Sequence, residues 1–294
     1  MMTSSSFSNT VVIVTGAASG IGRELALQAA ARGAVVVAAD INYKGLEAMR
    51  EIAWQQGAAM VIHQLDVADK EAVLLFAQTI IPRIKGHRLV LINNAGVALF
   101  SGSFHHTYLE DFEALLQVNL WGTIHMTKAF YPYFMEMNEG HIVNLSSVFG
   151  LGGVANQTAY CTSKFAVRGF TETLRMELLG TNVFTTAVHP GGIKTNIVKA
   201  ALPKGPIATA AMHRISVKSF EQMAKTTPEE AARLILDAVE KKKQRLVIGS
   251  DGKIIDLVTR LFPVSYTSIL KKQIEQVFAN PYKNRSTRAN RKRT

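Results

Sequence analysis

Cysteine is nearly absent from this sequence, since Cys161 is the only one among 294 residues. One cysteine cannot form an internal disulfide bond, and no group of cysteines and histidines has the spacing of a zinc site, so we expect no bound metal. Cys161 directly follows Tyr160, which raises the alternative of a catalytic thiol. Successive helical residues point about 100° apart and need not share a face, so we interpret Cys161 as a packing residue.

Long hydrophobic runs and a targeting segment are also missing. No stretch approaches the ~18 apolar residues of a transmembrane helix. The first ten residues carry neither the positive charge nor the apolar core of a secretory signal. We therefore expect a cytoplasmic protein with a flexible N-terminus over residues 1–9. A hydrophobic content of 48% is sufficient for a core and excludes disorder over most of the chain.

Acidic residues are scarce at the end of the chain. Residues 271–294 contain eight lysines and arginines against Glu275 alone, so they carry +7 of the total net charge of +11. We expect a basic tail over residues 281–294. A solvated tail without a partner is the commoner case, so we do not expect a nucleic-acid partner and keep peripheral membrane contact as an alternative.

Apolar residues recur at helical spacing just before this tail, interrupted by Pro263. The pattern predicts a helical C-terminal extension over residues 251–280. Such an extension could cover a subunit edge, line a substrate pocket or lie on a membrane surface.

Short apolar or β-branched runs alternate with helical patterns between residues 10 and 250, without a linker or a repeat. This alternation predicts the α/β class: a single doubly wound Rossmann-type domain over residues 10–250, with a parallel seven-stranded sheet and helices on both faces. The expected strands cover residues 11–15, 35–40, 60–66, 89–96, 141–147, 183–190 and 246–249.

Polar or glycine-rich clusters follow six of these strands. In parallel sheets of this kind, ligands bind at the carboxyl ends of the strands. The clusters are TGAASGIG at 15–22, Asp40, Asp66, NNAG at 93–96, Ser146-Ser147 and PGGIKT at 190–195. Their shared position predicts one ligand site along one edge of the sheet.

The first cluster places Gly16, Gly20 and Gly22 between a strand and a helix. That geometry presents free backbone N–H groups and a positive helix end to a phosphate, and glycines let the backbone approach it. Asp40 lies 18 residues beyond Gly22, where an acid accepts hydrogen bonds from the adenosine ribose and repels a 2′-phosphate. We therefore expect NAD as cofactor in preference to NADP. The alternative is that Asp40 caps the next helix.

Tyr160 and Lys164 lie four residues apart in an amphipathic helical pattern and therefore share one face. A nearby ammonium group favours the phenolate and lowers a tyrosine pKa from about 10, as a general acid/base requires. Such a pair by itself is more often an exposed surface feature. The polar clusters at the strand ends favour the catalytic interpretation here.

Taken together, these motifs resemble those of the short-chain dehydrogenase/reductase family over residues 10–250. TGAASGIG, NNAG and Tyr160-x-x-x-Lys164 match family motifs, and Ser147 lies 13 residues before Tyr160, the usual family spacing. The resemblance implies a catalytic set of Asn119, Ser147, Tyr160 and Lys164. It implies cofactor contacts from Gly16, Ser19, Gly20, Ile21, Gly22, Asp40, Asp66, Val67, Asn93, Ala95, Gly96, Tyr160, Lys164, Pro190, Gly191, Ile193 and Thr195.

The chemistry implied by the resemblance is hydride transfer between a nicotinamide and a carbinol carbon. Tyr160 exchanges a proton with the substrate oxygen, and Lys164 lowers the tyrosine pKa and holds the nicotinamide ribose. Ser147 hydrogen-bonds the substrate oxygen, and Asn119 anchors a water in the proton relay. The resemblance also implies a homodimer or homotetramer built through the helices that carry Asn119 and Tyr160.

Substrate contacts are expected from Phe149, Val154 and Asn156, and from an apolar lid between residue 196 and about residue 220. The lid favours a lipophilic secondary alcohol or ketone, although it could also be an ordinary surface helix. The function predicted from the sequence is thus an NAD(H)-dependent alcohol dehydrogenase or ketone reductase. The alternative is an NAD(H)-binding sensor or a membrane-surface-associated protein on the same fold.

Overall fold

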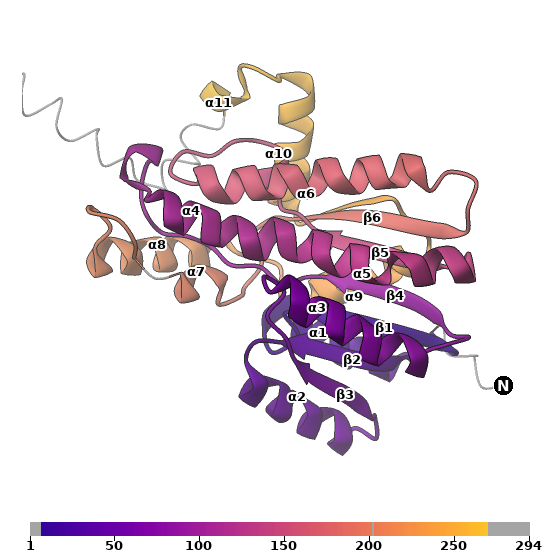
Figure 1. The fold of residues 1–294 in the computed structure, drawn as a ribbon. Coiled ribbons are helices and arrows are strands. Elements are labelled where there is room, and N and C mark those ends of the chain that lie inside the picture. Colours follow the sequence, from indigo (N-terminus) through magenta and orange to yellow (C-terminus); the bar gives the residue numbers. More distant parts are fainter. Residues whose placement is uncertain (1–6, 202, 270–294) are drawn as a thin grey trace, which may run out of the picture.

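A seven-stranded sheet in which all strands are parallel forms the centre of the computed structural model, which describes residues 7–201 and 203–269 (Figure 1). The order across the sheet is β3-β2-β1-β4-β5-β6-β7, so the winding reverses between β1 and β4 and opens a crevice at their carboxyl ends. This confirms the predicted fold class. The strands are β1 (Thr10–Thr15), β2 (Val35–Asp40), β3 (Met60–Gln64), β4 (Arg88–Asn93), β5 (Gly140–Leu145), β6 (Val183–Pro190) and β7 (Arg245–Ile248).

Helices cover both faces of this sheet because the strands between its two edges present apolar side chains in both directions. In β1, Val12 and Val14 pack toward one set of helices, whereas Val11 and Ile13 pack toward the other. Burial on both faces explains why the strands read as unbroken apolar runs. The first set comprises α1 (Gly20–Ala31), α2 (Tyr43–Gln55) and α9 (Pro228–Glu240), and the second comprises α3 (Lys70–Ile80), α5 (Gly122–Met137) and α6 (Thr158–Glu177).

The helix predicted around Asn119 contains an irregular turn. α4 (Leu109–Leu116) and α5 are joined by a π-helical segment, Gln117–Trp121, rather than by continuous α-helix. A π-helical turn inserts a residue and rotates the side chains that follow it. The turn places Asn119 in the interior with no exposed surface.

Additional helices follow the last two strands. After β6 come α7 (Ile197–Ala200) and α8 (Ala210–Met223), and after β7 come α10 (Ser250–Leu261) and α11 (Tyr266–Ile269). Pro263 lies between α10 and α11. The remainder of the predicted extension and the basic tail over 281–294 lie outside the described residues. Within 7–201 and 203–269, no helix is long and apolar enough to cross a membrane.

The packed core begins before the expected boundary at residue 10. Phe7 is fully buried in the core that includes α1 and α9, and its amide donates a hydrogen bond to the Arg32 carbonyl at 3.3 Å. Arg32 in turn forms ion pairs with Asp237 and Glu240 of α9, each at 2.8 Å. The expectation of a flexible segment through residue 9 therefore needs correction at Phe7, because burial of an aromatic side chain stabilises the folded state.

We expect Phe7→Ala to lower the free energy of unfolding by about 3–5 kcal/mol, because it removes a fully buried aromatic ring and leaves a cavity. Urea denaturation followed by tryptophan fluorescence measures this change. Phe104→Ala is the matched control, since that ring is 59% exposed. A loss below about 1 kcal/mol for Phe7→Ala would show that the segment before β1 adds little to the core.

Candidate active site

The glycine-rich turn after β1 lies against the loop after β4. Gly16 has a φ of +65°, and a Cβ there would lie 2.8 Å from the Ala95 Cα. A Cβ on Gly22 would collide with the Gly16 carbonyl oxygen. Ser19 forms the N-cap of α1 without a side-chain hydrogen bond to the helix, so the first amides of α1 are open to an anion.

Thr15 and Asn94 tie the two loops together. The Thr15 hydroxyl oxygen accepts hydrogen bonds from the Asn94 and Ala95 amides, at 3.0 and 3.1 Å. The Asn94 side-chain amide donates to the Thr15 and Gly16 carbonyls, at 2.9 and 3.1 Å. Neither Thr15 nor Asn94 was predicted as a site residue, although Thr15 begins the TGAASGIG motif and Asn94 belongs to the NNAG motif.

Asn93 requires a correction, because its side chain does not face a cofactor. It is buried, and its side-chain amide donates to Thr127 Oγ1 at 3.0 Å and to Asn144 Oδ1 at 2.8 Å. Asn144 continues this internal network to the Thr171 hydroxyl. Buried amides need partners, and the interior on this side of β4 supplies them for the Asn93 side-chain N–H groups. The Asn93 Oδ1 atom is buried and has no partner among the described residues.

Asp40 is held at the edge of the glycine-rich turn. Its carboxylate accepts hydrogen bonds from the Ala18 amide at 2.9 Å and from the Asn42 amide at 2.8 Å. The capping alternative fails, since Asn42 caps α2 through a hydrogen bond from the Gly45 amide. The acid therefore lies beside the turn that would hold a pyrophosphate.

The other predicted cofactor residues also lie at the carboxyl edge of the sheet. Asp66 is exposed and accepts a hydrogen bond from the Ala68 amide at 2.9 Å, whereas Val67 is buried. A Cβ on Gly20 would lie 3.3 Å from the Thr195 side chain, so the turn after β1 and the loop after β6 approach each other. Ile21, Gly96, Pro190, Gly191, Ile193 and Thr195 all line one cavity.

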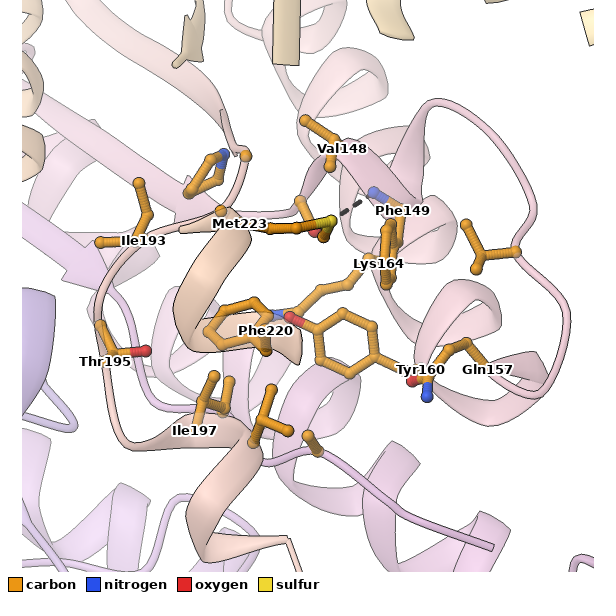
Figure 2. A pocket seen from close by; sticks show the side chains of 18 of the residues that line it. Val148, Phe149, Gln157, Tyr160, Lys164, Ile193, Thr195, Ile197, Phe220 and Met223 are labelled. Carbon is orange, nitrogen blue, oxygen red and sulfur yellow. Dashed lines mark hydrogen bonds between the residues drawn. The ribbon is translucent and has the colours of Figure 1, made fainter. Parts of the chain in front are cut away.

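Tyr160 and Lys164 enter this cavity from the same face of α6 (Figure 2). The Lys164 ammonium donates a hydrogen bond to the Leu145 carbonyl at 2.9 Å and lies 5.6 Å from the centre of the Tyr160 ring. Burial raises the pKa of Tyr160 to about 12, although hydrogen bonding with Ser147 offsets part of the rise. Burial also lowers the pKa of Lys164 to about 8. The pKa of Tyr160 is therefore raised rather than lowered as predicted, because desolvation is the largest effect and hydrogen bonding with Ser147 is the only one that lowers it.

Two serines follow β5, and the structure distinguishes their roles. The Ser146 hydroxyl donates to the Lys164 carbonyl at 2.8 Å and so fixes α6 against β5. The Ser147 hydroxyl accepts a hydrogen bond from the Phe149 amide at 3.2 Å and lines the cavity with Tyr160. These contacts favour the choice of Ser147 over Ser146.

His189 contacts the backbone of Ser147. It is fully buried, and since a carbonyl only accepts, its Nδ1–H donates to the Ser147 carbonyl at 3.2 Å. Its Nε2 has no partner among the described residues. Burial lowers the pKa of His189 to about 4, so the ring is neutral at pH 7.

Asn119 stabilises the loop after β4. Its Oδ1 accepts from the Val97 amide at 2.8 Å, and its side-chain amide donates to the Val97 carbonyl at 3.0 Å and the Ser163 hydroxyl at 3.2 Å. Both side-chain hydrogens are therefore used. The role predicted for Asn119 in a proton relay stays a prediction. Cys161 is buried, and burial raises the pKa of its thiol, which agrees with a packing role.

The cavity has a volume of about 530 Å³ and a largely apolar wall (Figure 2). Phe149 and Val154 line it, whereas Asn156 does not. Asn156 adopts a left-handed φ of +65°, and the next residue, Gln157, lines the cavity instead. The predicted lid region and the extension also contribute residues to the lining: Ile197, Val198, Ala201, Ser216, Phe220, Met223, Asp251, Ile254 and Ile255.

These features fit a dinucleotide. The turn has no room for side chains at Gly16 and Gly22, the first amides of α1 are open, and Asp40 lies alongside. The cavity continues from Ile21 past Thr195 to Tyr160, so one ligand could extend from the turn to the catalytic pair.

Comparison with known proteins identifies the family. A model of the short chain dehydrogenase family matches residues 10–205. A Mycobacterium tuberculosis protein that carries the name oxidoreductase SadH is 38% identical over 277 residues, which are 93% of this chain and 98% of that protein. The 3-oxoacyl-(acyl-carrier-protein) reductase FabG of Thermotoga maritima is 34% identical over 83% of this chain and 97% of its own.

Solved structures give the same result. A short-chain dehydrogenase/reductase from Burkholderia phymatum in complex with NAD has a TM-score of 0.80 and 26% identity, covering 88% of this chain and 95% of its own. A metagenomic short-chain oxidoreductase in complex with NADP has a TM-score of 0.67 and 26% identity, covering 83% of this chain and 97% of its own. The chain belongs to the short-chain dehydrogenase/reductase family and is an NAD(P)-dependent oxidoreductase.

The neutral His189 predicts a pH dependence of stability. Its folded pKa of about 4 lies below the unfolded value, so the unfolded chain binds the proton first as the pH falls. The contribution of the neutral His189 to the free energy of unfolding is therefore fully present above pH 6.5. It decreases toward pH 4, by about 1.4 kcal/mol per pH unit at most. His189→Asn keeps a donor near the Ser147 carbonyl and removes the titrating group. We expect a shallower decrease in the urea-unfolding free energy between pH 6.5 and 4.5, and an unchanged slope would contradict this account.

Proposed function

We propose that this protein interconverts a lipophilic secondary alcohol and the corresponding ketone, with NAD(H) as cofactor. The observation that supports this most directly is the composition of the cavity wall around Tyr160. Apolar side chains from the loop after β5, from the lid helices and from α10 make up most of this wall. Such a wall favours an apolar substrate held by one oxygen atom.

Each catalytic residue has a different role at that oxygen atom. The nicotinamide, when bound, supplies or accepts the hydride. Ser147 donates a hydrogen bond to the substrate oxygen, and Tyr160 Oη transfers the proton. The Lys164 ammonium, held by the Leu145 carbonyl, stabilises negative charge that develops on the phenol. Because the pKa of Tyr160 is about 12, the phenol holds its proton at pH 7 and can donate it to a ketone oxygen during reduction.

The preference for NAD rests on Asp40. Its carboxylate is fixed beside the glycine-rich turn by the Ala18 and Asn42 amides, where a ribose would follow the pyrophosphate. A 2′-phosphate at this position would meet a negative charge in a half-buried environment. We therefore propose NAD rather than NADP.

A homodimer or homotetramer through α5 and α6 is part of the proposal. Trp121, Phe165 and Met176 are 45%, 41% and 61% exposed on or next to these helices. Apolar side chains of this size are typical of subunit contacts. Peripheral membrane contact through the basic tail concerns residues 281–294, which lie outside the described part of the chain.

Tyr160→Phe tests the catalytic assignment. We expect kcat for ketone reduction to fall about 10²–10⁴-fold, because general acid catalysis is lost, while the NADH dissociation constant changes little. The assay is NADH oxidation with ketones of increasing chain length and ring count, and kcat/KM should rise with lipophilicity. Tyr108→Phe is the control, since Tyr108 is 54% exposed and does not line the cavity. NADH binding without turnover of any ketone or alcohol would favour the sensor alternative.

Asp40→Asn tests the cofactor preference. The variant keeps an oxygen for the Ala18 amide but removes the charge that would repel a 2′-phosphate. We expect the ratio of kcat/KM for NADPH to that for NADH to rise about tenfold or more, equivalent to ~1.4 kcal/mol. Asp66→Asn removes a charge at the end of the next strand and should affect both cofactors alike. An unchanged ratio in Asp40→Asn would show that the carboxylate does not select NAD.

A further inference from the structure

The sequence contains two Gly-Gly pairs, and both lie against the C-terminal extension. Gly191-Gly192 follows β6 on the cofactor side of the cavity, and Gly152-Gly153 lies in the loop after β5 on the substrate side. In each pair, a side chain of the extension occupies the space that a Cβ on one of the glycines would need. The extension therefore contacts both loops that border the reacting centre.

Asp251 makes the contact on the cofactor side. It is the second residue of α10, and its carboxylate accepts a hydrogen bond from the Gly192 amide at 2.7 Å. A Cβ on Gly191 would collide with the same carboxylate, so a larger residue there would displace it. Pro190, Gly191, Ile193 and Thr195 of this loop line the cavity.

Tyr266 makes the contact on the substrate side. Its hydroxyl oxygen accepts a hydrogen bond from the Gly153 amide at 2.9 Å. A Cβ on Gly152 would lie 2.9 Å from Thr259 Cγ2 and 3.2 Å from Tyr266 Cε2, which shows how closely the loop and the extension pack. The next residues of the loop, Val154 and Gln157, line the cavity.

The extension between these two contacts is fixed to the sheet. Arg245 of β7 forms two hydrogen bonds with the Asp256 carboxylate, at 2.9 and 2.6 Å, and both side chains are about one-fifth exposed. A bidentate pair of this kind fixes orientation as well as distance. Ile254 and Ile255 of the same helix line the cavity between the two loops.

We propose that Asp251 and Tyr266 are positioning residues that hold the cofactor loop and the substrate loop at a fixed separation, and that α10–α11 thereby helps to determine substrate size. The inference rests on the proposed reduction of a lipophilic ketone. Neither residue exchanges a proton with the substrate: Asp251 acts through the backbone of Gly191-Gly192, and Tyr266 acts through the backbone of Gly153. Each should therefore change ligand affinity on its own side of the cavity more than the rate of the chemical step.

The test compares Tyr266→Phe, Asp251→Ala and Asp251→Asn in the full-length chain. Tyr266→Phe removes one hydrogen-bond acceptor, so we expect the KM for a bulky ketone to rise roughly 3- to 10-fold, with a smaller effect on a short ketone and an unchanged NADH dissociation constant. Asp251→Ala should raise the NADH dissociation constant roughly 3- to 10-fold or more. Asp251→Asn keeps an acceptor oxygen for the Gly192 amide and should restore most of the affinity.

Three outcomes would overturn the proposal. Equal losses for short and bulky ketones in Tyr266→Phe would indicate a general structural role. A wild-type NADH dissociation constant in Asp251→Ala would show that the Gly192 contact does not position the cofactor loop. Failure of Asp251→Asn to restore affinity would show that the hydrogen bond to Gly192 is not the cause. Tyr108→Phe serves as the control for removal of an exposed tyrosine hydroxyl.

The experiment also separates this proposal from the proposed function. If no ketone or alcohol is turned over by the wild type, the substrate assignment fails, but NADH fluorescence still tests Asp251. Amide hydrogen exchange over residues 148–157 then tests Tyr266, because loss of its hydroxyl should increase exchange in this loop. Unchanged exchange in Tyr266→Phe would overturn the positioning role without reference to any substrate.

Discussion

The hydrogen bonds that join the carboxyl ends of β1 and β4 are the constraint on which the site depends. The Thr15 hydroxyl holds the amides of Asn94 and Ala95, and the Asn94 side chain holds the carbonyls of Thr15 and Gly16. These bonds lie where the winding of the sheet reverses, so they fix the crevice in which a dinucleotide binds. The glycine-rich turn, the open end of α1 and the loop that Asn119 supports are all positioned relative to this junction.

Burial sets the electrostatics at the other end of the cavity. Tyr160 and Lys164 are desolvated together, which moves the pKa of the phenol to about 12 and that of the ammonium to about 8. Both shifts favour the neutral forms, as expected for groups removed from water. An apolar site also strengthens any charge interaction that develops during the reaction. The same apolar walls thus desolvate the catalytic groups and support the proposed lipophilic substrate.

The residues proposed to select the cofactor and the substrate lie in different parts of the fold. Asp40 ends β2, next to the edge strand β3, and is fixed by neighbouring backbone amides. The substrate side is built from elements added to the sheet: α8 is joined to α7 by the hydrogen bond between His213 and the Val198 carbonyl, and α10 closes on the loop after β6. Loops and added helices vary without disturbing a rigid framework, so substrate choice can change while the hydride chemistry is retained.

The strand–helix alternation, the parallel sheet, the glycine-rich turn and the Tyr160–Lys164 pair could be predicted from the amino-acid sequence, because each depends on local periodicity or on fixed spacing along the chain. Other features became visible only in the folded chain. Phe7 is buried, the Asn93 side chain points into the interior, and Gln157 rather than Asn156 lines the cavity. Asp251 and Tyr266 contact glycines that are distant in the sequence. Burial also reversed the expected pKa shift of Tyr160. Desolvation and contacts between distant segments depend on which surfaces meet in three dimensions, and no spacing in the sequence records that.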